Sequence, residues 1–411
     1  MQVPLEYRVR FQQSMKPPIG VHVRPPIAGS EPCYIPDTDL LFDAPWLATT
    51  DLLFICERHV VVPPEPGTTV VVPIKRIYAV LNNVSLRRVD GNIPLPQTSG
   101  LTLSLDDGSW TWGFSAVLPG RALADLEPTS TGEPVEIEAT INGVAYRGLI
   151  ESISRDRTFA RSDIRVSGRG KAALLDAPYA PTLNFGNPFD DLTAQQLATE
   201  VLTINGVPLG WSLDWKPEDW LVPSDAWSHA GTYISALNAI ASAAGAYLQP
   251  HRTDESLSVL LRYPAAPWDW ASVIPDFELP ADPVQKESIE WIERARYNRV
   301  YVSGLKTGVI GKVTRAGTAG NLVAPMVVDQ LITSAAAARQ RALPVLANVG
   351  RQALLTLRLP ILSETGVIPP GKFIRFIDAG VTRIGITRSV SVTASLPTIW
   401  QTIGVETHVA A

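Results

Sequence analysis

The chain has 411 residues, a hydrophobic content of 45% and a formal net charge of −5. This length is enough for two to four domains, and the hydrophobic content is typical of a globular protein with buried cores. No block of lysine and arginine stands out, which argues against tight binding of nucleic acid. No apolar run approaches the roughly 18 residues that span a bilayer, and the first residues form no signal peptide. We therefore expect no membrane span and synthesis in the cytoplasm.

Residues 1–78 are rich in proline and are expected to form an N-terminal docking segment or a small β domain. Proline restricts the free chain, so ordering such a segment on a partner costs less entropy. The two cysteines of the chain, Cys33 and Cys56, lie here. The simplest interpretation is two small buried side chains. The alternative is one disulfide, although a cytoplasmic product normally keeps its thiols reduced.

Residues 79–180 show the alternation that is typical of antiparallel β structure. Apolar and polar residues alternate through Leu101–Leu105, and a turn is predicted at Asp107-Gly108. Further along, Asn142-Gly143 separates two alternating runs, which is the strongest short signal of a β-hairpin. Several short strands at this spacing predict a barrel or a sandwich.

Residues 181–285 are predicted to form a small α+β insert. Thr193 to Gln196 fits a capping box, and apolar residues follow it on one helical face. A second helix is predicted from about Thr232 to Gly245. A hairpin is predicted after it, roughly over residues 247–262.

Residues 286–411 return mostly to β structure. Strands are predicted at Arg299–Gly304, Lys372–Ile377 and Thr382–Val392. An alanine-rich helix begins at Ser334, and Pro344 is expected to interrupt or shorten it. The two β regions show no obvious sequence repeat, but their matched layout suggests two related barrels.

A search for catalytic, cofactor and metal sites finds none, so we expect no enzyme activity, no cofactor and no metal. The five histidines are scattered, and no serine-hydrolase elbow is present. Gly168-Arg169-Gly170-Lys171 lacks the spacing of a phosphate-binding loop. The better interpretation is the end of a strand, where glycines let the backbone change direction. Acidic pairs, among them Glu218-Asp219, are common in a chain with 40 acidic residues. Asp106-Asp107 falls at a predicted turn and Asp190-Asp191 at a helix start, which are ordinary places for them.

Tryptophan is the one unusual feature of the composition, because six of the 11 tryptophans lie in the insert. These candidate partner-interface residues are Trp211, Trp215, Trp220, Trp227, Trp268 and Trp270. Packing of a small domain is the simplest interpretation. The alternatives are a surface that holds a partner protein and, less favoured, an aromatic platform for sugars.

Three stretches of the sequence follow one another in an order that one known family shares. The first is the end of a strand and the residues after it, from Gly168 to Pro178, and the second is the pair of helices that follows. The third is Arg383–Val390, which comes after Pro370-Gly371-Lys372 in the chain. In this order they resemble the baseplate hub and tail-tip hub proteins of tailed bacteriophages, the late control protein D-like family. The resemblance implies a mainly β fold with an α+β insert. Two tail-tube-like β-barrels would occupy 79–180 and 286–411, with a small helical and hairpin domain at 181–285.

The resemblance also implies a homotrimer, in which two barrels per chain give three copies a pseudo-sixfold ring. A closed ring of this kind requires head-to-tail interfaces. Candidate strand edges for them are Leu101–Leu105, Val135–Ile141 and Phe373–Ile377. The segment of about 78 residues before the first barrel points to the long, non-contractile tail of a siphophage, where it would bind the distal tail ring.

The implied function is that of a structural tail-tip hub in the virion, which joins the tail tube to the tip complex and lines the channel for DNA ejection. Expected partners are the distal tail protein ring or tail tube, the tape-measure protein, and the central fibre or receptor-binding protein. DNA would pass without specific binding. A tailocin or a gene transfer agent would use the same hub. The alternative is a carbohydrate-binding or glycan-degrading surface protein that uses the tryptophan-rich insert.

Overall fold

The computed structural model describes residues 8–9, 40–41, 69–78, 80–96, 98–128, 133–159, 161–306, 309–378 and 380–408. The chain forms two compact units, Met1–Gly67 and Thr68–Ala411. In the first unit, β1 (Arg8–Val9) pairs antiparallel with β2 (Leu40–Leu41). Cys33 and Cys56 lie outside the described residues, as does most of the expected docking segment.

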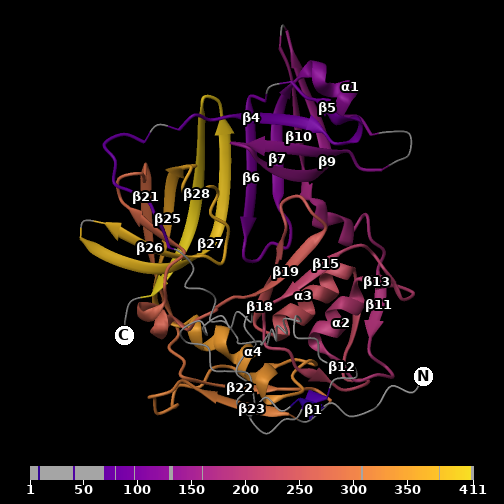
Figure 1. Ribbon diagram of the computed structural model, residues 1–411, viewed down its shortest axis with the longest axis vertical. Helices are drawn as coiled ribbons and strands as arrows, with labels where there is room; N and C mark the ends of the chain where they lie inside the picture. Colours follow the sequence, from indigo (N-terminus) through magenta and orange to yellow (C-terminus); the bar gives the residue numbers. More distant parts are fainter. Residues whose placement is uncertain are drawn as a thin grey trace. The chain divides into compact units, whose positions relative to one another are not determined.

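The second unit is built on one sheet of 14 strands (Figure 1). The first half of this sheet contains β4 (Val84–Arg88), β5 (Ile93–Pro94), β6 (Gly100–Asp106), β7 (Gly113–Pro119), β8 (Glu136–Ile141), β9 (Val144–Thr158) and β10 (Arg161–Gly170). The second half contains β20 (Phe277–Pro280), β21 (Lys286–Arg294), β25 (Gly350–Pro360), β26 (Phe373–Asp378), β27 (Val381–Ser395) and β28 (Thr398–His408), with β3 (Val70–Val71) beside β20. The helix α1 (Leu123–Leu126) separates β7 from β8 in the chain. The predicted mainly β class is confirmed.

Alternating side chains place one face of each strand in the core. In β6, for example, Leu101, Leu103 and Leu105 are buried, whereas Ser104 is exposed. The predicted hairpin between β8 and β9 forms as well. Its turn residues Asn142 and Gly143 have φ values of 48° and 84°, which asparagine and glycine adopt most readily.

The α+β insert has its own core, built around α2 (Ala194–Val201) and α3 (Tyr233–Ala243). Its short strands are β11 (Leu183–Gly186), β12 (Leu192–Thr193), β13 (Thr203–Ile204), β14 (Val207–Pro208), β15 (Ser212–Trp215), β16 (Leu221–Val222), β17 (Ser228–Gly231), β18 (Ala246–Pro250) and β19 (Ser256–Leu261). Both helices and the β18–β19 hairpin lie where the sequence predicts them.

Replacing Thr193 by alanine is expected to lower the free energy of unfolding by about 1 kcal/mol, because Thr193 caps α2. Its Oγ1 accepts a hydrogen bond from the Gln196 N–H at 3.2 Å, and the Gln196 side chain accepts one from the Thr193 N–H at 2.9 Å. Urea unfolding measures the change. Thr199→Ala on the same helix is the control, since the Thr199 hydroxyl only bonds the Gln195 carbonyl. An equal loss in both variants would contradict the capping role.

Residues 299–347 differ from the predicted division of the chain. β22 (Arg299–Ser303), β23 (Ile310–Thr314) and β24 (Val327–Val328) form a separate three-stranded sheet. Val300 and Val302 are buried in the core of the insert and not in that of the second half of the large sheet. The alternation of apolar and polar residues predicted the strand at Arg299–Ser303, but it does not determine which hydrophobic core the strand joins. The boundaries at 78, 180 and 285 stay predictions.

The helix α4 (Ala335–Ala347) runs through Pro344, so the predicted interruption is wrong. Pro344 lies in the last turn, where its missing N–H costs one intrahelical hydrogen bond, and its carbonyl still accepts from the Asn348 N–H at 3.1 Å. Within the described part of the chain, no helix is both long and apolar enough to cross a membrane.

Candidate functional site

The two halves of the large sheet contain the same three-strand unit. β8, β9 and β10 have 6, 15 and 10 residues, and β26, β27 and β28 have 6, 15 and 11. The two units begin at residues 136 and 373, so their residue numbers differ by 237. The same difference separates β9 from β27, which begin at 144 and 381, and β10 from β28, which begin at 161 and 398. The units therefore correspond without an insertion or a deletion.

The correspondence includes a β-bulge in the long strand of each unit. The register between β9 and β10 shifts around Glu151, and the register between β27 and β28 shifts around Arg388. These two residues occupy corresponding positions. Residues identical in both units are Ile137 and Ile374, Gly143 and Gly380, Val144 and Val381, Gly148 and Gly385, Ser152 and Ser389, and Ser154 and Ser391. A bulge at the same place marks the units as one repeated structure, because bulges are specific local features of a strand pair.

Each bulge holds an ion pair to the neighbouring strand, and the two ion pairs have opposite polarity. Arg169 Nη2 of β10 lies 2.7 Å from Glu151 Oε1, and Arg388 Nε of β27 lies 2.8 Å from Glu406 Oε2. Arg169 and Glu406 also occupy corresponding positions. The repeat thus keeps the geometry of the pair while acid and base change places.

The flanking strands extend the repeat. β7 pairs with β10 as β25 pairs with β28, and β6 lies beside β7 as β21 lies beside β25. The pairing registers extend the correspondence from β10 and β28 to these strands. By this route Pro119 corresponds to Pro360, and Leu103 corresponds to Ile289. Each half therefore has the same order of five strands, β6-β7-β10-β9-β8 in one and β21-β25-β28-β27-β26 in the other.

The two halves join where β27 pairs with β6 (Figure 1). Ser389–Ala394 runs antiparallel to Leu101–Asp106, with Val390 opposite Leu105. Both of these side chains are buried. The junction is thus a ladder of backbone hydrogen bonds with an apolar core on one face.

A buried charged cluster lies at the end of this junction. Arg388 Nη1 lies 3.2 Å from Asp107 Oδ2, in the turn after β6. On the other side of Arg388, Glu406 Oε1 accepts hydrogen bonds from the Tyr263 hydroxyl at 2.6 Å and from His408 Nε2 at 2.8 Å. The cluster links both halves of the sheet to Tyr263, which follows β19 of the insert.

Replacing Glu406 by glutamine is expected to destabilise the protein by about 2 kcal/mol at pH 7, and by less as the pH falls. Burial would raise the pKa of Glu406, but the hydrogen bond from His408 and the charge of Arg388 outweigh it and bring the pKa to about 2. Because this pKa lies below its ordinary value of 4.5, the stabilisation is complete above that pH and is lost as the pH falls towards 2. Urea unfolding of both proteins between pH 7 and pH 3 measures the difference. A difference that stays constant over this range would contradict the assignment.

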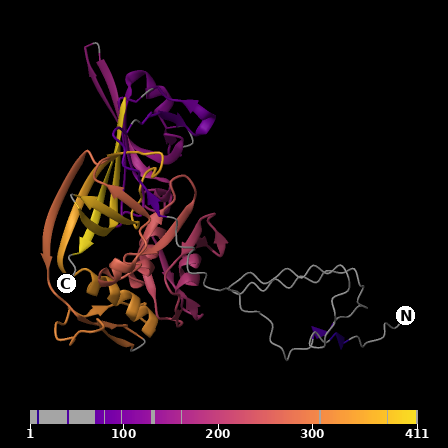
Figure 2. The ribbon, with the colours of Figure 1, turned by 60° about the vertical axis from the view of Figure 1, so that its left-hand side comes forward.

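Two of the strand edges without a partner strand among the described residues lie in different halves of the large sheet. One is the outer half of β9, Ser152–Arg157, and the other is the edge of β21 that faces away from β25. Figures 1 and 2 show the β9–β10 hairpin extending beyond the other strands of its half. Backbone groups on such an edge can pair with another chain.

The three edges predicted from the sequence are covered on both sides. Leu101–Leu105 lies between β7 and β27, Val135–Ile141 between β9 and β4, and Phe373–Ile377 between β27 and β20. Their alternating apolar residues mark strands that face a core, which says nothing about whether the strand lies at an edge. The prediction that these strands offer free edges is therefore wrong.

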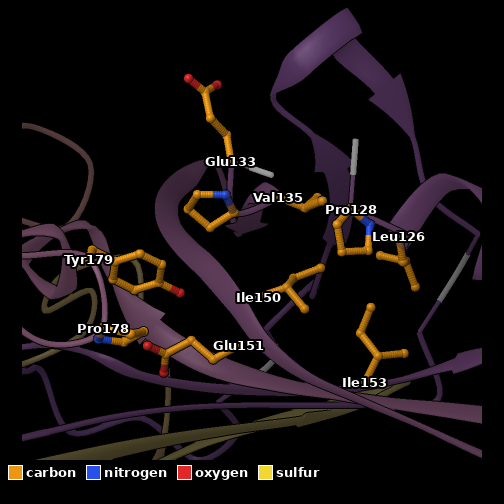
Figure 3. Close-up of a pocket in the computed structure, with 10 residues that line it drawn as sticks. Leu126, Pro128, Glu133, Val135, Ile150, Glu151, Ile153, Pro178 and Tyr179 are labelled. Atoms are coloured by element: carbon orange, nitrogen blue, oxygen red, sulfur yellow. The ribbon is translucent and has the colours of Figure 1, made fainter. Parts of the chain in front are cut away.

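A pocket of about 690 Å³ lies beside the β9 edge. Figure 3 shows Leu126, Ile150 and Ile153 towards one end of it, and Glu151 and Tyr179 towards the other. Burial and the nearby Glu151 carboxylate raise the pKa of Tyr179. The pocket thus has an apolar end and a polar end.

The six tryptophans of the insert do not form one exposed surface. Trp220, Trp227 and Trp270 are buried, and the indole N–H groups of Trp220 and Trp270 donate to the carbonyls of Leu331 and Ala265. Trp211 and Trp215 are half-buried against the core of the insert, and Trp268 is exposed, with Arg315 over its ring. A role for any of the six in partner binding stays a prediction.

The glycine-rich run and the acidic pairs have structural partners. In the run, Arg169 bonds Glu151 and Asp176, and Lys171 Nζ lies 3.0 Å from Glu255 Oε1. Among the acids, Asp219 Oδ1 accepts from the N–H groups of Gln195 and Trp220. No group of three or more histidine, cysteine, aspartate or glutamate side chains within the described ranges is placed to hold a metal ion.

Solved structures of two tail proteins are similar in fold to this chain. A tail protein from Neisseria meningitidis MC58 superposes with a TM-score of 0.58 and 18% identity, over 80% of this chain and 97% of that one. The 43 kDa tail protein of prophage MuSo2 from Shewanella oneidensis gives 0.51 and 16%, over 78% and 95%. The chain has the fold of these two tail proteins. No protein-family model and no curated protein matches its sequence.

Within this tail-protein fold, two related β regions were expected from the sequence, but the sequence signal of the repeat, the exchanged ion pairs and β21 were missed. One signal for the repeat was present. The pattern Gly-Val-x-x-x-Gly-x-x-x-Ser-x-Ser occurs at residues 143–154 and again at residues 380–391. Glycines and serines at these places read as ordinary β-hairpin residues, so the pattern gave no reason to align two segments so far apart.

Proposed function

We propose that this protein is a structural hub at the tip of a phage tail, where three copies form a ring. The observation that carries the proposal is the internal repeat, since two equivalent halves per chain give a trimer six similar units. Closing such a ring requires head-to-tail interfaces. The outer half of β9 in one half and the outer edge of β21 in the other have no described partner strand, and a head-to-tail interface needs two such different edges.

A ring of six similar units matches a sixfold tail tube, so the hub would join the tube to the tip complex and enclose the channel for DNA ejection. Its neighbours would be the distal tail ring or the tube itself, the tape-measure protein, and the central fibre or receptor-binding protein. A net charge of −5 suits a channel wall that does not hold DNA. The role is mechanical, with no catalytic step.

The N-terminal docking segment, residues 1–78, would bind the distal tail ring of a siphophage-type tail. Its prolines lower the entropic cost of ordering on that ring. The virion would then carry the protein at the tail tip after its synthesis in the host cytoplasm.

Gold-labelled antibodies against this protein, imaged on negatively stained particles, test the position. Label at the tail tip is the expected result. Label at the head or along the tail shaft would overturn the proposal. Particles assembled without the protein serve as the control for antibody specificity.

A further inference from the structure

We propose that the exposed ring of Trp291 in one copy enters the pocket beside Ile153 of the next copy, as β21 of the first pairs with β9 of the second. The inference rests on the proposed ring and adds the residues and the register that hold it together. Its template is the junction inside the chain, where β27 pairs with β6. The repeat maps β27 onto β9 and β6 onto β21.

The register between copies follows from the junction by this mapping. Ser389–Ala394 corresponds to Ser152–Arg157, and Leu101–Asp106 corresponds to Glu287–Ile292. The opposed residues are then Ser152 with Ile292, Ile153 with Trp291, Ser154 with Glu290, Arg155 with Ile289, Asp156 with Ser288, and Arg157 with Glu287. A shift by one residue would turn every side chain to the other face, so the register is a sharp expectation.

The apolar contact is a tryptophan against an apolar pocket. Leu105, the counterpart of Trp291, is 3% exposed in the junction, whereas Trp291 is 44% exposed, with the guanidinium groups of Arg351 and Arg383 5.0 and 5.7 Å from its ring centre. Ile153, opposite Trp291 in the inferred register, lines the pocket together with Leu126 and Ile150 (Figure 3). A large aromatic ring that fills a pocket near the centre of an interface is the usual source of binding energy between proteins.

The charges of the two edges are compatible with this register. Arg157 lies opposite Glu287, and Asp156 is diagonal to Lys286 and to Glu290. No pair of like charges lies directly opposite. The one pair of charges directly opposite, Arg157 with Glu287, is attractive in this alignment.

Burial differs between the two bulges as the inference requires. The side chains of Arg388 and Glu406 are 11% and 7% exposed. The turn after β6 contacts Arg388 through Asp107, and Tyr263 of the insert contacts both side chains. The side chains of Arg169 and Glu151, beside the open pocket, are 25% and 24% exposed. The end of β21 from the next copy would contact the second pair as the turn after β6 contacts the first.

Disulfide trapping in the full-length protein tests the register. In a background of Cys33→Ser and Cys56→Ser, the pair Asp156→Cys and Ser288→Cys places thiols opposite one another, at a Cβ separation of about 4.5–5.5 Å that a disulfide can close with a small adjustment. Mild oxidation is expected to link copies into a species three times the 44.5 kDa chain mass. The matched control is Arg155→Cys with Ser288→Cys, whose thiols lie on opposite faces and should not link.

The outcomes separate the register from the ring. If the cysteine-free background stays monomeric by light scattering, the ring itself fails. If it forms a trimer but the Asp156 and Ser288 pair does not link, or the control links equally well, the register fails while the ring stands.

Trp291→Ala tests the pocket contact on its own. The concentration at which the trimer forms is expected to rise about tenfold or more. Trp268→Ala, at another exposed tryptophan, should leave that concentration unchanged. Equal assembly of Trp291→Ala and the unmodified protein would overturn the contact.

Discussion

Replacing Arg388 by methionine is expected to lower the free energy of unfolding by about 3 kcal/mol, since it removes the arginine beside the buried Glu406 carboxylate and one of the two arginines, Arg262 and Arg388, beside Asp107. Methionine keeps an apolar stem of similar length, so little packing is lost. The guanidinium it removes lies 2.8 Å from Glu406 and 3.2 Å from Asp107. Burial already raises the pKa of Asp107, and the loss of Arg388 would raise it further. Urea unfolding at pH 7 measures the effect.

The matched control is Arg169→Met, which removes the cation of the corresponding pair in the first half of the sheet. The side chains of that pair are 25% and 24% exposed, so water can solvate the remaining carboxylate. A loss of about 1 kcal/mol is expected. Equal losses of unfolding free energy in the two variants would show that the buried cluster contributes no more to stability than the more exposed ion pair.

Replacing Gly168 by alanine is expected to cost about 3 kcal/mol, because the bulge brings backbone against backbone there. An added Cβ would fall on the carbonyl oxygen of Leu149 and 3.1 Å from the amide nitrogen of Glu151. Both atoms belong to β9, which pairs with β10, so neither can move without disturbing the ladder. Loss of urea stability in Gly168→Ala is the measurement.

Gly100→Ala is the control for this effect, since it also lies in a strand of the first half. An added Cβ there meets nothing within 4 Å. The change in unfolding free energy should be below about 1 kcal/mol and can be stabilising, because alanine loses less backbone entropy. A tolerated Gly168→Ala would mean that the bulge at Glu151 is not as tight as described.

Much of the fold follows from local patterns in the sequence. Alternation at Leu101–Leu105, the turn at Asn142-Gly143 and the capping box at Thr193 each determine their element, because each depends on neighbours in the chain. The core that a strand joins depends on residues far away. Val300 and Val302 alternate like strands of the large sheet, yet they pack in the core of the insert.

The candidate interface was harder to predict than the fold. The repeat keeps the position of the bulge but exchanges Glu151 and Arg169 for Arg388 and Glu406, so charge similarity is lost where the structure is most alike. Aromatic clustering drew attention to the insert, where packing uses the tryptophans. Trp291 lies outside that cluster, and only the pairing of β21 shows that it sits on a strand edge without a described partner.

Electron microscopy of the purified full-length protein, averaged along the particle axis, tests the central claim most directly. Three chains are expected in a closed ring whose channel is surrounded by six similar lobes, two from each chain. A ring with a different number of chains would contradict the account. So would a trimer in which the two lobes of each chain lie at different distances from the channel axis, because the two halves would then not be equivalent.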